Sequence, residues 1–306
     1  MTKQWGAPET ALPPILSQGD FPAGLRRDEA QRHLTAFFSA AGLETPGLDA
    51  RLLLCAALGI DHAGLIRDPA EPIGDKAKVL DAFCRRRLAR EPVSRIIGER
   101  EFWSLDLKLD PAVLDPRPDT ETLIDLVLRE VGKRACPPQR VLDLGTGSGA
   151  ILAALLTEWP EAFGVGVDLS PRTCAIAAGN FARLGLGDRA AVFCGRWSAA
   201  LSGRFDLIVS NPPYIVLDEI DTLAPEVSLY DPRLALDGGP DGFDAYRALL
   251  PPLASLLAEG GLVALECGAG QSPILQDLLR AAQLEPMSIG LDLSGHERVV
   301  LAKSFS

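Results

Sequence analysis

Residues 141–150 of the chain read VLDLGTGSGA. The first four, of which three are apolar, are typical of a buried strand, and Ala150 begins an apolar segment with helical spacing. The glycines between them let the backbone approach a ligand closely, and the N-terminus of the following helix favours a negative group. This order of strand, glycine turn and helix predicts a ligand site at the end of a strand.

Strands and helices continue to alternate after this segment. The pattern predicts a mostly parallel sheet covered by helices on both faces. The predicted strands are residues 141–144, 163–168, 190–194, 205–210, 262–266, 286–289 and 298–302. The predicted helices are residues 150–159, 171–184, 243–257 and 271–282.

A carboxylate, Asp168, ends the second of these strands. A carboxylate in this place can accept both hydroxyls of a ribose. Because Gly145, Gly147 and Ala150 satisfy the dinucleotide pattern G-x-G-x-x-G/A, NAD is one reading of this segment. Asp143 favours S-adenosylmethionine instead, since a carboxylate there would repel a pyrophosphate but could meet the ammonium of a methionine.

A second unusual stretch, Asn211-Pro212-Pro213-Tyr214, follows the predicted strand 205–210. Each proline fixes its own φ and restricts the residue before it, so we expect the carbonyls of Asn211 and Pro212 to remain free acceptors. Asn211 adds a side-chain amide and Tyr214 a flat ring. Such a rigid shelf suits a planar guest carrying an NH2 group, either a carboxamide or the amino group of a base. The alternative is a proline-rich turn that only ends the strand.

The composition is that of an ordinary globular chain, with 306 residues, 47% hydrophobic residues and a net charge of −11. Acidity counts against a nucleic-acid substrate, because phosphate binding depends on clustered Lys and Arg. Six cysteines form no CxxC pair, so neither a metal site nor a disulfide framework is predicted, and a reducing, cytoplasmic location is expected. We recognise neither a signal peptide nor a membrane span.

The N-terminal third has a different character, with several short helical patterns that predict a small helical domain. The helix at 46–58 is expected to bury Leu48, Leu52, Cys55 and Ala56. Arg85, Arg86, Arg87 and Arg90 are expected to form either a solvated face or a contact for an acidic or nucleic-acid-bearing partner. The predicted parts are a flexible tail over 1–25, a helical domain over 26–92, a linker hairpin over 93–116 and an α/β domain over 117–306.

Several stretches together resemble the release-factor glutamine methyltransferases, the PrmC/HemK family. Besides the glycine loop, they are EPVSRIIG at 91–98, EFW at 101–103, PRPDTE at 116–121, NPPYI at 211–215, ALDGGPDG at 235–242 and LECG at 265–268. Within the PRPDTE stretch, Asp119 or Thr120 is also expected to cap the next helix. The resemblance covers about residues 28–306.

The resemblance implies an α/β fold, a Rossmann-like S-adenosylmethionine-dependent methyltransferase domain with a seven-stranded, mostly parallel sheet, preceded by the helical domain. It implies a cofactor site lined by Gly145, Thr146, Gly147, Ser148, Gly149, Asp168, Trp197 and Asn211, with Trp197 stacking on adenine. It also implies a substrate site of Asn211, Pro212, Pro213 and Tyr214, in which Asn211, Pro212 and Tyr214 are the catalytic residues.

The implied activity is methyl transfer from S-adenosylmethionine to the side-chain nitrogen (N5) of the glutamine in the Gly-Gly-Gln motif of peptide-chain release factors. The helical domain would grip the body of the release factor, and residues 215–242 would wall the substrate pocket. The chain is expected to act as a monomer, without a membrane and without a direct nucleic-acid substrate. Open alternatives are an amino-methyltransferase acting on adenine in nucleic acid, and a binding module without catalysis.

Overall fold

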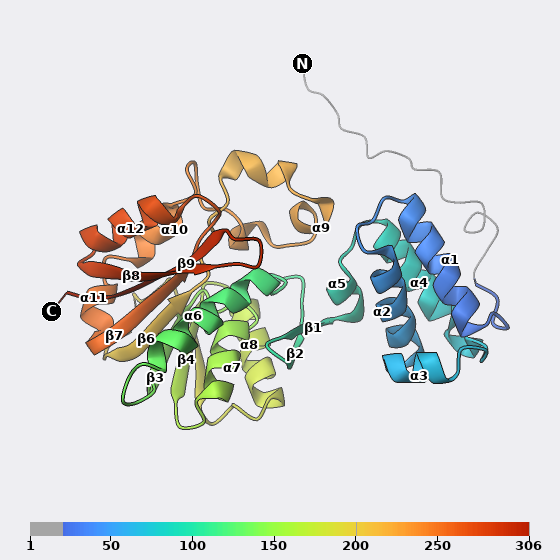
Figure 1. Ribbon diagram of the computed structural model, residues 1–306, viewed down its shortest axis with the longest axis horizontal. Coiled ribbons are helices and arrows are strands. Elements are labelled where there is room, and N and C mark those ends of the chain that lie inside the picture. Colours follow the sequence, from blue (N-terminus) through green and yellow to red (C-terminus); the bar gives the residue numbers. More distant parts are fainter. Residues whose placement is uncertain (1–20, 200, 306) are drawn as a thin grey trace, which may run out of the picture. The chain divides into compact units, whose positions relative to one another are not determined.

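The computed structural model describes residues 21–199 and 201–305 and divides into two compact units at the bond between Ile97 and Gly98. Each unit has its own hydrophobic core. Figure 1 shows the helices of the first unit and the sheet and helices of the second. Most of the predicted tail, residues 1–20, lies outside the described residues. In the described part of the chain, no helix has the length and apolar character needed to cross a membrane.

The first unit is helical, as predicted. Its core is formed mainly by apolar side chains from the two long N-terminal helices and the fourth helix. The helices are α1 (Arg27–Ala40), α2 (Pro46–Leu58), α3 (His62–Arg67), the 3₁₀ turn η1 (Gly74–Lys76), α4 (Ala77–Leu88) and α5 (Val93–Ile97).

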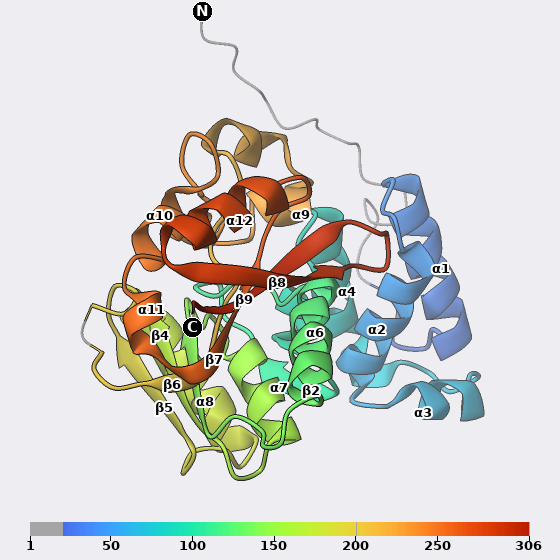
Figure 2. The same cartoon turned by 60° about the vertical axis from the view of Figure 1, so that its left-hand side comes forward.

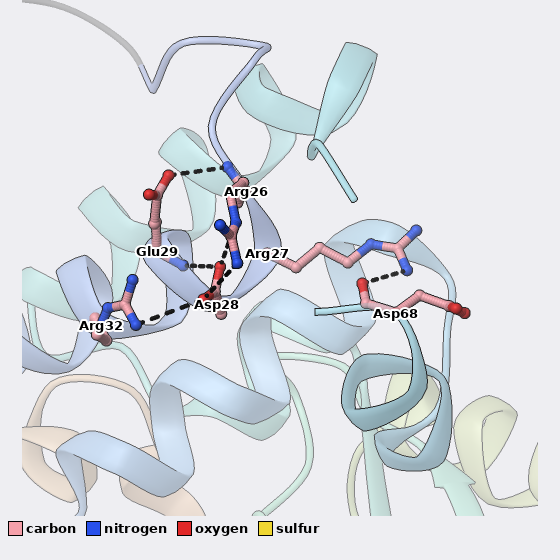
Figure 3. A network of polar contacts seen from close by, with 6 residues as sticks. All are labelled: Arg26, Arg27, Asp28, Glu29, Arg32 and Asp68. Carbon is pink, nitrogen blue, oxygen red and sulfur yellow. Dashed lines mark hydrogen bonds and ion pairs between the residues drawn. The ribbon is translucent and has the colours of Figure 1, made fainter. Parts of the chain in front are cut away.

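Polar contacts fix the start of α1 (Figure 3). The Glu29 carboxylate accepts the backbone N–H of Arg26 at 3.4 Å, and the Arg26 guanidinium donates to Asp28 at 3.1 Å. Arg27 points the other way and donates to the carbonyl of Asp68 at 3.4 Å, which ties α1 to the segment after α3. Acidic groups in the first turn also suit the positive end of the helix dipole.

Helix α2 buries a different face from the predicted one. Leu48 and Leu52 are 43% and 40% exposed, so their predicted burial is wrong. The buried residues are Asp49, Ala50, Leu53, Leu54 and Ala57. The helix is apolar nearly all round, and its orientation follows an ion pair in which Arg87 Nε lies 2.7 Å from Asp49 Oδ2.

The arginine cluster on α4 is largely engaged within its own unit. Arg87 is only 6% exposed, so it lies neither on a solvated face nor on a surface that a partner contacts, and both predictions are wrong for this residue. Arg86 binds the Glu91 carboxylate at 2.6 Å, and Arg85 binds Asp81 at 2.9 Å. Asp81 lies one turn before Arg85 on the same helix, and Glu91 lies just after the end of α4.

The second unit is built on a seven-stranded sheet of order β5-β4-β3-β6-β7-β9-β8, which confirms the predicted fold class. The strands from β5 to β7 are parallel, while β9 and β8 run antiparallel to their neighbours. The strands are β3 (Arg140–Leu144), β4 (Phe163–Asp168), β5 (Ala190–Cys194), β6 (Phe205–Ser210), β7 (Leu257–Glu266), β8 (Leu284–Leu291) and β9 (Glu297–Ser304).

Helices cover both faces of this sheet (Figure 2). Each set of helices packs over its own layer of apolar side chains. One face is covered by α6 (Glu121–Val131), α7 (Ala150–Glu158) and α8 (Pro171–Arg183). The other is covered by α10 (Asp244–Leu249), α11 (Leu253–Leu256) and α12 (Ser272–Ala281). The single helix predicted over 243–257 is wrong, because Pro251 and Pro252 interrupt it and β7 already begins at Leu257.

Shorter elements complete the second unit. A hairpin lies within the predicted range 93–116, although residues 93–97 form helix α5. It consists of β1 (Glu99–Phe102) and β2 (Leu105–Lys108). The remaining elements are η2 (Pro118–Thr120), η3 (Leu217–Thr222), α9 (Pro225–Ser228) and η4 (Arg233–Ala235).

The two edges of the parallel strands differ. At the amino edge, the Asp206 carboxylate accepts the N–H groups of Gln139 and Arg140 at 2.8 Å each, and the exposed Cys136 lies in the preceding turn. At the carboxyl edge, β3, β4 and β6 are adjacent, which brings together three loops far apart in sequence. Ligands of open α/β sheets bind at this edge.

Candidate active site

A cavity of about 580 Å³ opens at the carboxyl edge of β3, β4 and β6. Most of the residues assigned to the site from the sequence line it, namely Gly145, Thr146, Gly147, Ser148, Asp168, Trp197, Asn211 and Pro213. Gly149, Pro212 and Tyr214 are not among its lining residues. The volume is within the usual range for small-molecule pockets.

The glycine loop is held rigidly against its neighbours. Its N–H groups at Gly145 and Thr146 both donate to the Val167 carbonyl of β4, at 2.8 and 2.9 Å. Gly149 has φ of +84°, and a Cβ at this residue would lie 2.8 Å from the Phe181 ring. Only glycine therefore lets α7 approach α8 this closely.

Asn180 of α8 is a supporting residue that the sequence reading missed. Its buried amide donates to the Ser148 carbonyl at 2.9 Å and exchanges two hydrogen bonds with the backbone of Lys108. One side chain thus ties the glycine loop to the β1–β2 hairpin. A lone Asn inside an amphipathic helix gives no sequence signal for this role.

Asp168 faces the cavity from the end of β4. Its carboxylate accepts the N–H of Gly147 at 3.1 Å and that of Ser170 at 3.0 Å, while burial raises the pKa of this carboxyl. The exposed Cys194 is its neighbour on β5. Each carboxylate oxygen has a second lone pair, so Asp168 can still accept hydroxyl groups of a ligand.

Asp143 does not contact the cavity, so its predicted meeting with a ligand ammonium is wrong. It is fully buried under the glycine loop, and Oδ2 accepts the Thr146 hydroxyl at 2.7 Å. Burial raises the pKa of its carboxyl to about 7. Asp143 therefore supports the loop, and its position does not separate S-adenosylmethionine from NAD.

Trp197 lies in the loop after β5 with φ of +49°, in the left-handed region that a bulky residue rarely adopts. A Cβ placed on Gly145 would be 3.6 Å from Trp197 Cζ3, so the ring lies beside the glycine loop. The indole and the loop thus form adjacent walls of one cavity, as the family resemblance implies.

The Asn211–Tyr214 segment begins directly after β6. Asn211 Nδ2 donates to Thr120 Oγ1 at 3.2 Å, while Oδ1 of Asn211 and the Pro212 carbonyl accept no hydrogen bond within residues 21–199 and 201–305. Thr120 precedes α6, but its hydroxyl does not cap that helix as predicted. The Tyr214 hydroxyl donates to Glu266 Oε1 at 3.3 Å, so its ring is anchored away from solvent.

The DGGPDG segment, residues 237–242, supports Tyr214 from the other side. Ile215 and Asp237 form a parallel bridge, and the Gly238 N–H donates to the Ile215 carbonyl at 2.8 Å. The Gln271 side chain donates to the Tyr214 carbonyl at 2.9 Å. The backbone of Tyr214 is thus fixed by two segments distant in sequence.

The long segment 215–242 forms part of the cavity wall, as expected. Its lining residues are Pro232, Leu234, Ala235 and Asp237. An ion pair between Arg117 and the buried Asp231 joins this wall to the PRPDTE stretch. The PRPDTE stretch is thus joined to the segment that precedes the ALDGGPDG motif.

Comparison with known proteins agrees with this arrangement. Residues 29–98 match the family model of the PrmC N-terminal domain, and residues 120–226 match that of the methyltransferase small domain. The release factor glutamine methyltransferase of Bradyrhizobium diazoefficiens is 49% identical over 281 residues, covering 90% of this chain and 94% of that protein. The chain belongs to the release factor glutamine methyltransferase family. The family resemblance read from the motifs is thus confirmed.

Other relatives support the same family. The release factor glutamine methyltransferase of Caulobacter vibrioides is 46% identical over 263 residues, covering 85% of this chain and 90% of that protein. Among solved structures, the hMettl16 catalytic domain in complex with MAT2A 3'UTR hairpin 6 has a TM-score of 0.55 at 14% identity, covering 67% of this chain and 77% of that one. At this identity the likeness concerns the fold alone.

Proposed function

We propose that this chain transfers a methyl group from S-adenosylmethionine to the side-chain nitrogen (N5) of the glutamine in the Gly-Gly-Gln motif of peptide-chain release factors. The observation that carries the proposal is the placement of Asn211. Its amide lies on the wall of the cavity that also contains the glycine loop and Asp168, and its oxygen has no hydrogen-bond partner among the described residues. Membership of the family supports the same activity.

The cavity fits the proposed cofactor. Asp168 offers acceptors for the ribose hydroxyls, Trp197 offers a ring for adenine, and the glycine loop leaves room for the methionine part. S-adenosylmethionine supplies, when bound, an electrophilic methyl group on a sulfonium centre. These residues would bind and orient the cofactor, and the proposed reaction requires none of them to accept a proton.

Asn211 and Pro212 would act on the substrate amide. An amide nitrogen is a weak nucleophile because its lone pair is shared with the carbonyl. If Asn211 Oδ1 and the Pro212 carbonyl each accept one of its N–H groups, the nitrogen is fixed in orientation and the positive charge that develops on it is stabilised. Tyr214 would flank the flat amide, with its hydroxyl anchored on Glu266. No general base is required during transfer.

The proposal extends to the partner and to the domain roles. We assign residues 26–92 to gripping the body of the release factor, 93–116 to the linker and 117–306 to methyl transfer. Support comes from the separate helical unit and from the match of the PrmC N-terminal domain to residues 29–98. We also propose that the chain is a cytoplasmic monomer. We further propose that it has no nucleic-acid substrate, and the net charge of −11 supports this last point.

The direct test is methyl transfer from labelled S-adenosylmethionine to a purified release factor, with the Gly-Gly-Gln glutamine intact or replaced by alanine. Label on the intact factor alone is the expected result. Label on unpaired DNA or RNA in place of the factor would overturn the substrate assignment and favour the base-methylating alternative.

Two variants separate the roles within the site. Asn211→Ala is expected to lower kcat by about 10²- to 10³-fold while the Kd for S-adenosylmethionine stays unchanged. Asp168→Ala serves as the contrasting variant, with weakened cofactor binding and a kcat that recovers at saturating cofactor. Weaker cofactor binding with unchanged turnover in Asn211→Ala would contradict the catalytic assignment.

A further inference from the structure

Three motifs of the sequence meet at one side chain that belongs to none of them, that of Gln271. Its Nε2 donates to the Tyr214 carbonyl at 2.9 Å, and its Oε1 accepts the Gly268 N–H at 2.9 Å. A Cβ on Gly242 would lie 2.6 Å from Gln271 Nε2, so the DGGPDG segment packs against the same amide. The amide therefore lies where the NPPYI, LECG and ALDGGPDG stretches come together.

Helix α12 does not account for this amide. Gln271 directly precedes the helix, yet among the described residues its side chain makes no capping hydrogen bond. The main chain of Gln271 serves the helix and the turn before it, since its carbonyl accepts the Leu275 N–H at 3.0 Å and its N–H donates to the Gly268 carbonyl at 3.0 Å. The side chain is thus committed to Tyr214 and Gly268.

The two ends of the Gln271 amide are not interchangeable. A carbonyl only accepts and an N–H only donates, so a rotated amide would place its oxygen against the Tyr214 carbonyl and its NH2 against the Gly268 N–H. Both hydrogen bonds therefore exist in one orientation alone. Glycine at 268 allows the close approach, because a Cβ there would lie 3.0 Å from Gln271 Oε1 and 3.2 Å from Tyr214 Cδ2.

Tyr214 is held at both of its ends from the loop that follows β7. Glu266 accepts the ring hydroxyl at 3.3 Å, and Gln271 donates to the main-chain carbonyl. This carbonyl follows the proposed substrate acceptor, the Pro212 carbonyl, by two residues. Because Pro212 and Pro213 each fix φ, a displacement at Tyr214 is transmitted to the acceptor with little local compensation.

We propose that Gln271 is a positioning residue for methyl transfer. It acts through the main chain of Tyr214 and keeps the Pro212 carbonyl directed at the substrate amide. The inference rests on the proposed function and adds to it a residue outside the cavity. Because Gln271, Gly268 and Tyr214 are not among the lining residues of the cavity, loss of the amide should lower turnover and leave cofactor binding unchanged.

The first test removes the donor at nearly constant side-chain length with Gln271→Met. We expect kcat on the release factor to fall by about 10- to 100-fold, with the Kd for S-adenosylmethionine within about twofold of wild type. Gln276→Met is the matched control, because within the described part of the chain the Gln276 side chain bonds only Ser272 and Arg280 of its own helix. Equal kcat in Gln271→Met and wild type would overturn the inference.

The second test separates positioning from packing with Gln271→Glu, which keeps the size of the side chain. The ionised carboxylate only accepts, so it repels the Tyr214 carbonyl, whereas its protonated form can donate again. Burial beside this carbonyl raises the pKa of the introduced carboxyl above its usual value of about 4.3. The ratio of the variant's kcat to that of wild type should therefore rise by about tenfold from pH 8 to pH 5.

The control Gln276→Glu should keep a kcat ratio near one over the same pH range. A low ratio in Gln271→Glu that does not change with pH would show a role in packing alone and overturn the inference. If Gln271→Met is unfolded by its melting temperature, the pH dependence of Gln271→Glu decides the question by itself.

The same measurements distinguish failure of the proposed function from failure of this inference. Wild-type enzyme that does not methylate the release factor refutes the proposed function and the inference that rests on it. An active wild type with equally active Gln271→Met and Gln271→Glu refutes the role of Gln271 alone and leaves the glutamine-directed activity in place.

Discussion

Replacing Gly238 by alanine tests whether the DGGPDG segment holds the Asn211–Tyr214 backbone in place. A Cβ on Gly238 would lie 2.8 Å from Tyr214 Cα and 2.9 Å from both Cα and O of Gly242. Ordinary van der Waals contacts begin near 3.4 Å, and all three neighbours are backbone atoms that no side-chain rotation can move away. The φ of Gly238 is not positive, so the effect is steric and free of backbone strain.

The expected cost follows from this overlap. Overpacking a close-packed site costs about 1–3 kcal/mol of unfolding free energy. Because Tyr214 must shift to make room, the displaced acceptors should lower kcat by about 10- to 100-fold. Urea unfolding and methyl transfer to a release factor measure the two effects, and the Kd for S-adenosylmethionine should stay within about twofold of wild type.

Gly179→Ala is the matched control. Gly179 lies in α8 without a positive φ, and a Cβ added to it would meet no atom within 4 Å among the described residues. The same substitution should therefore stabilise the protein here, by up to about 1 kcal/mol. If Gly238→Ala unfolds like this control and keeps full kcat, then the loop does not position the segment and the reasoning fails.

Two further predictions concern buried charges. Folding raises the pKa of the Asp143 carboxyl from 3.8 to about 7. Between these two values the folded protein keeps a proton that the unfolded chain has released. Asp143 therefore lowers the free energy of unfolding as pH rises through this range, by up to about 4 kcal/mol. Without cofactor, Asp143→Asn should therefore gain stability relative to wild type between pH 5 and pH 8 in urea unfolding, and a difference independent of pH would refute this. Arg87→Met leaves Asp49 buried without its ion-pair partner and should lower the free energy of unfolding by about 3–5 kcal/mol. The double variant Arg87→Met, Asp49→Leu should recover much of this loss, because it removes the unpaired charge. Equal melting temperatures for Arg87→Met and wild type would contradict this assignment.

Much of the second unit could be predicted because its signals are local. The glycine loop, Asp168 and the Asn-Pro-Pro-Tyr stretch each follow an apolar strand, and parallel strands bring their carboxyl ends to one edge. The sheet is buried on both faces, so its strands read as continuous apolar runs with clear limits. These features place the site before any tertiary contact is known.

The parts that could not be predicted depend on long-range pairing. The buried face of α2 follows Asp49 and Arg87, which are far apart in sequence. Thr120 has the sequence position of a helix cap, yet its hydroxyl accepts a hydrogen bond from Asn211. Asp143 has the spacing of a ligand residue, yet the glycine loop covers it. In each case the residue type is compatible with two roles, and only the packed structure decides between them.

The asymmetry between the two sheet edges extends to reactive thiols. Cys136 and Cys194 are the exposed cysteines of the chain. Cys194 neighbours Asp168 on the adjoining strand, whereas Cys136 lies in the turn that leads into β3 at the opposite edge. A fluorophore on Cys194 should therefore change its emission when a nucleoside enters the cavity, while one on Cys136 should respond only to unfolding. The native sequence thus provides an internal pair of reporter and reference positions for optical binding measurements.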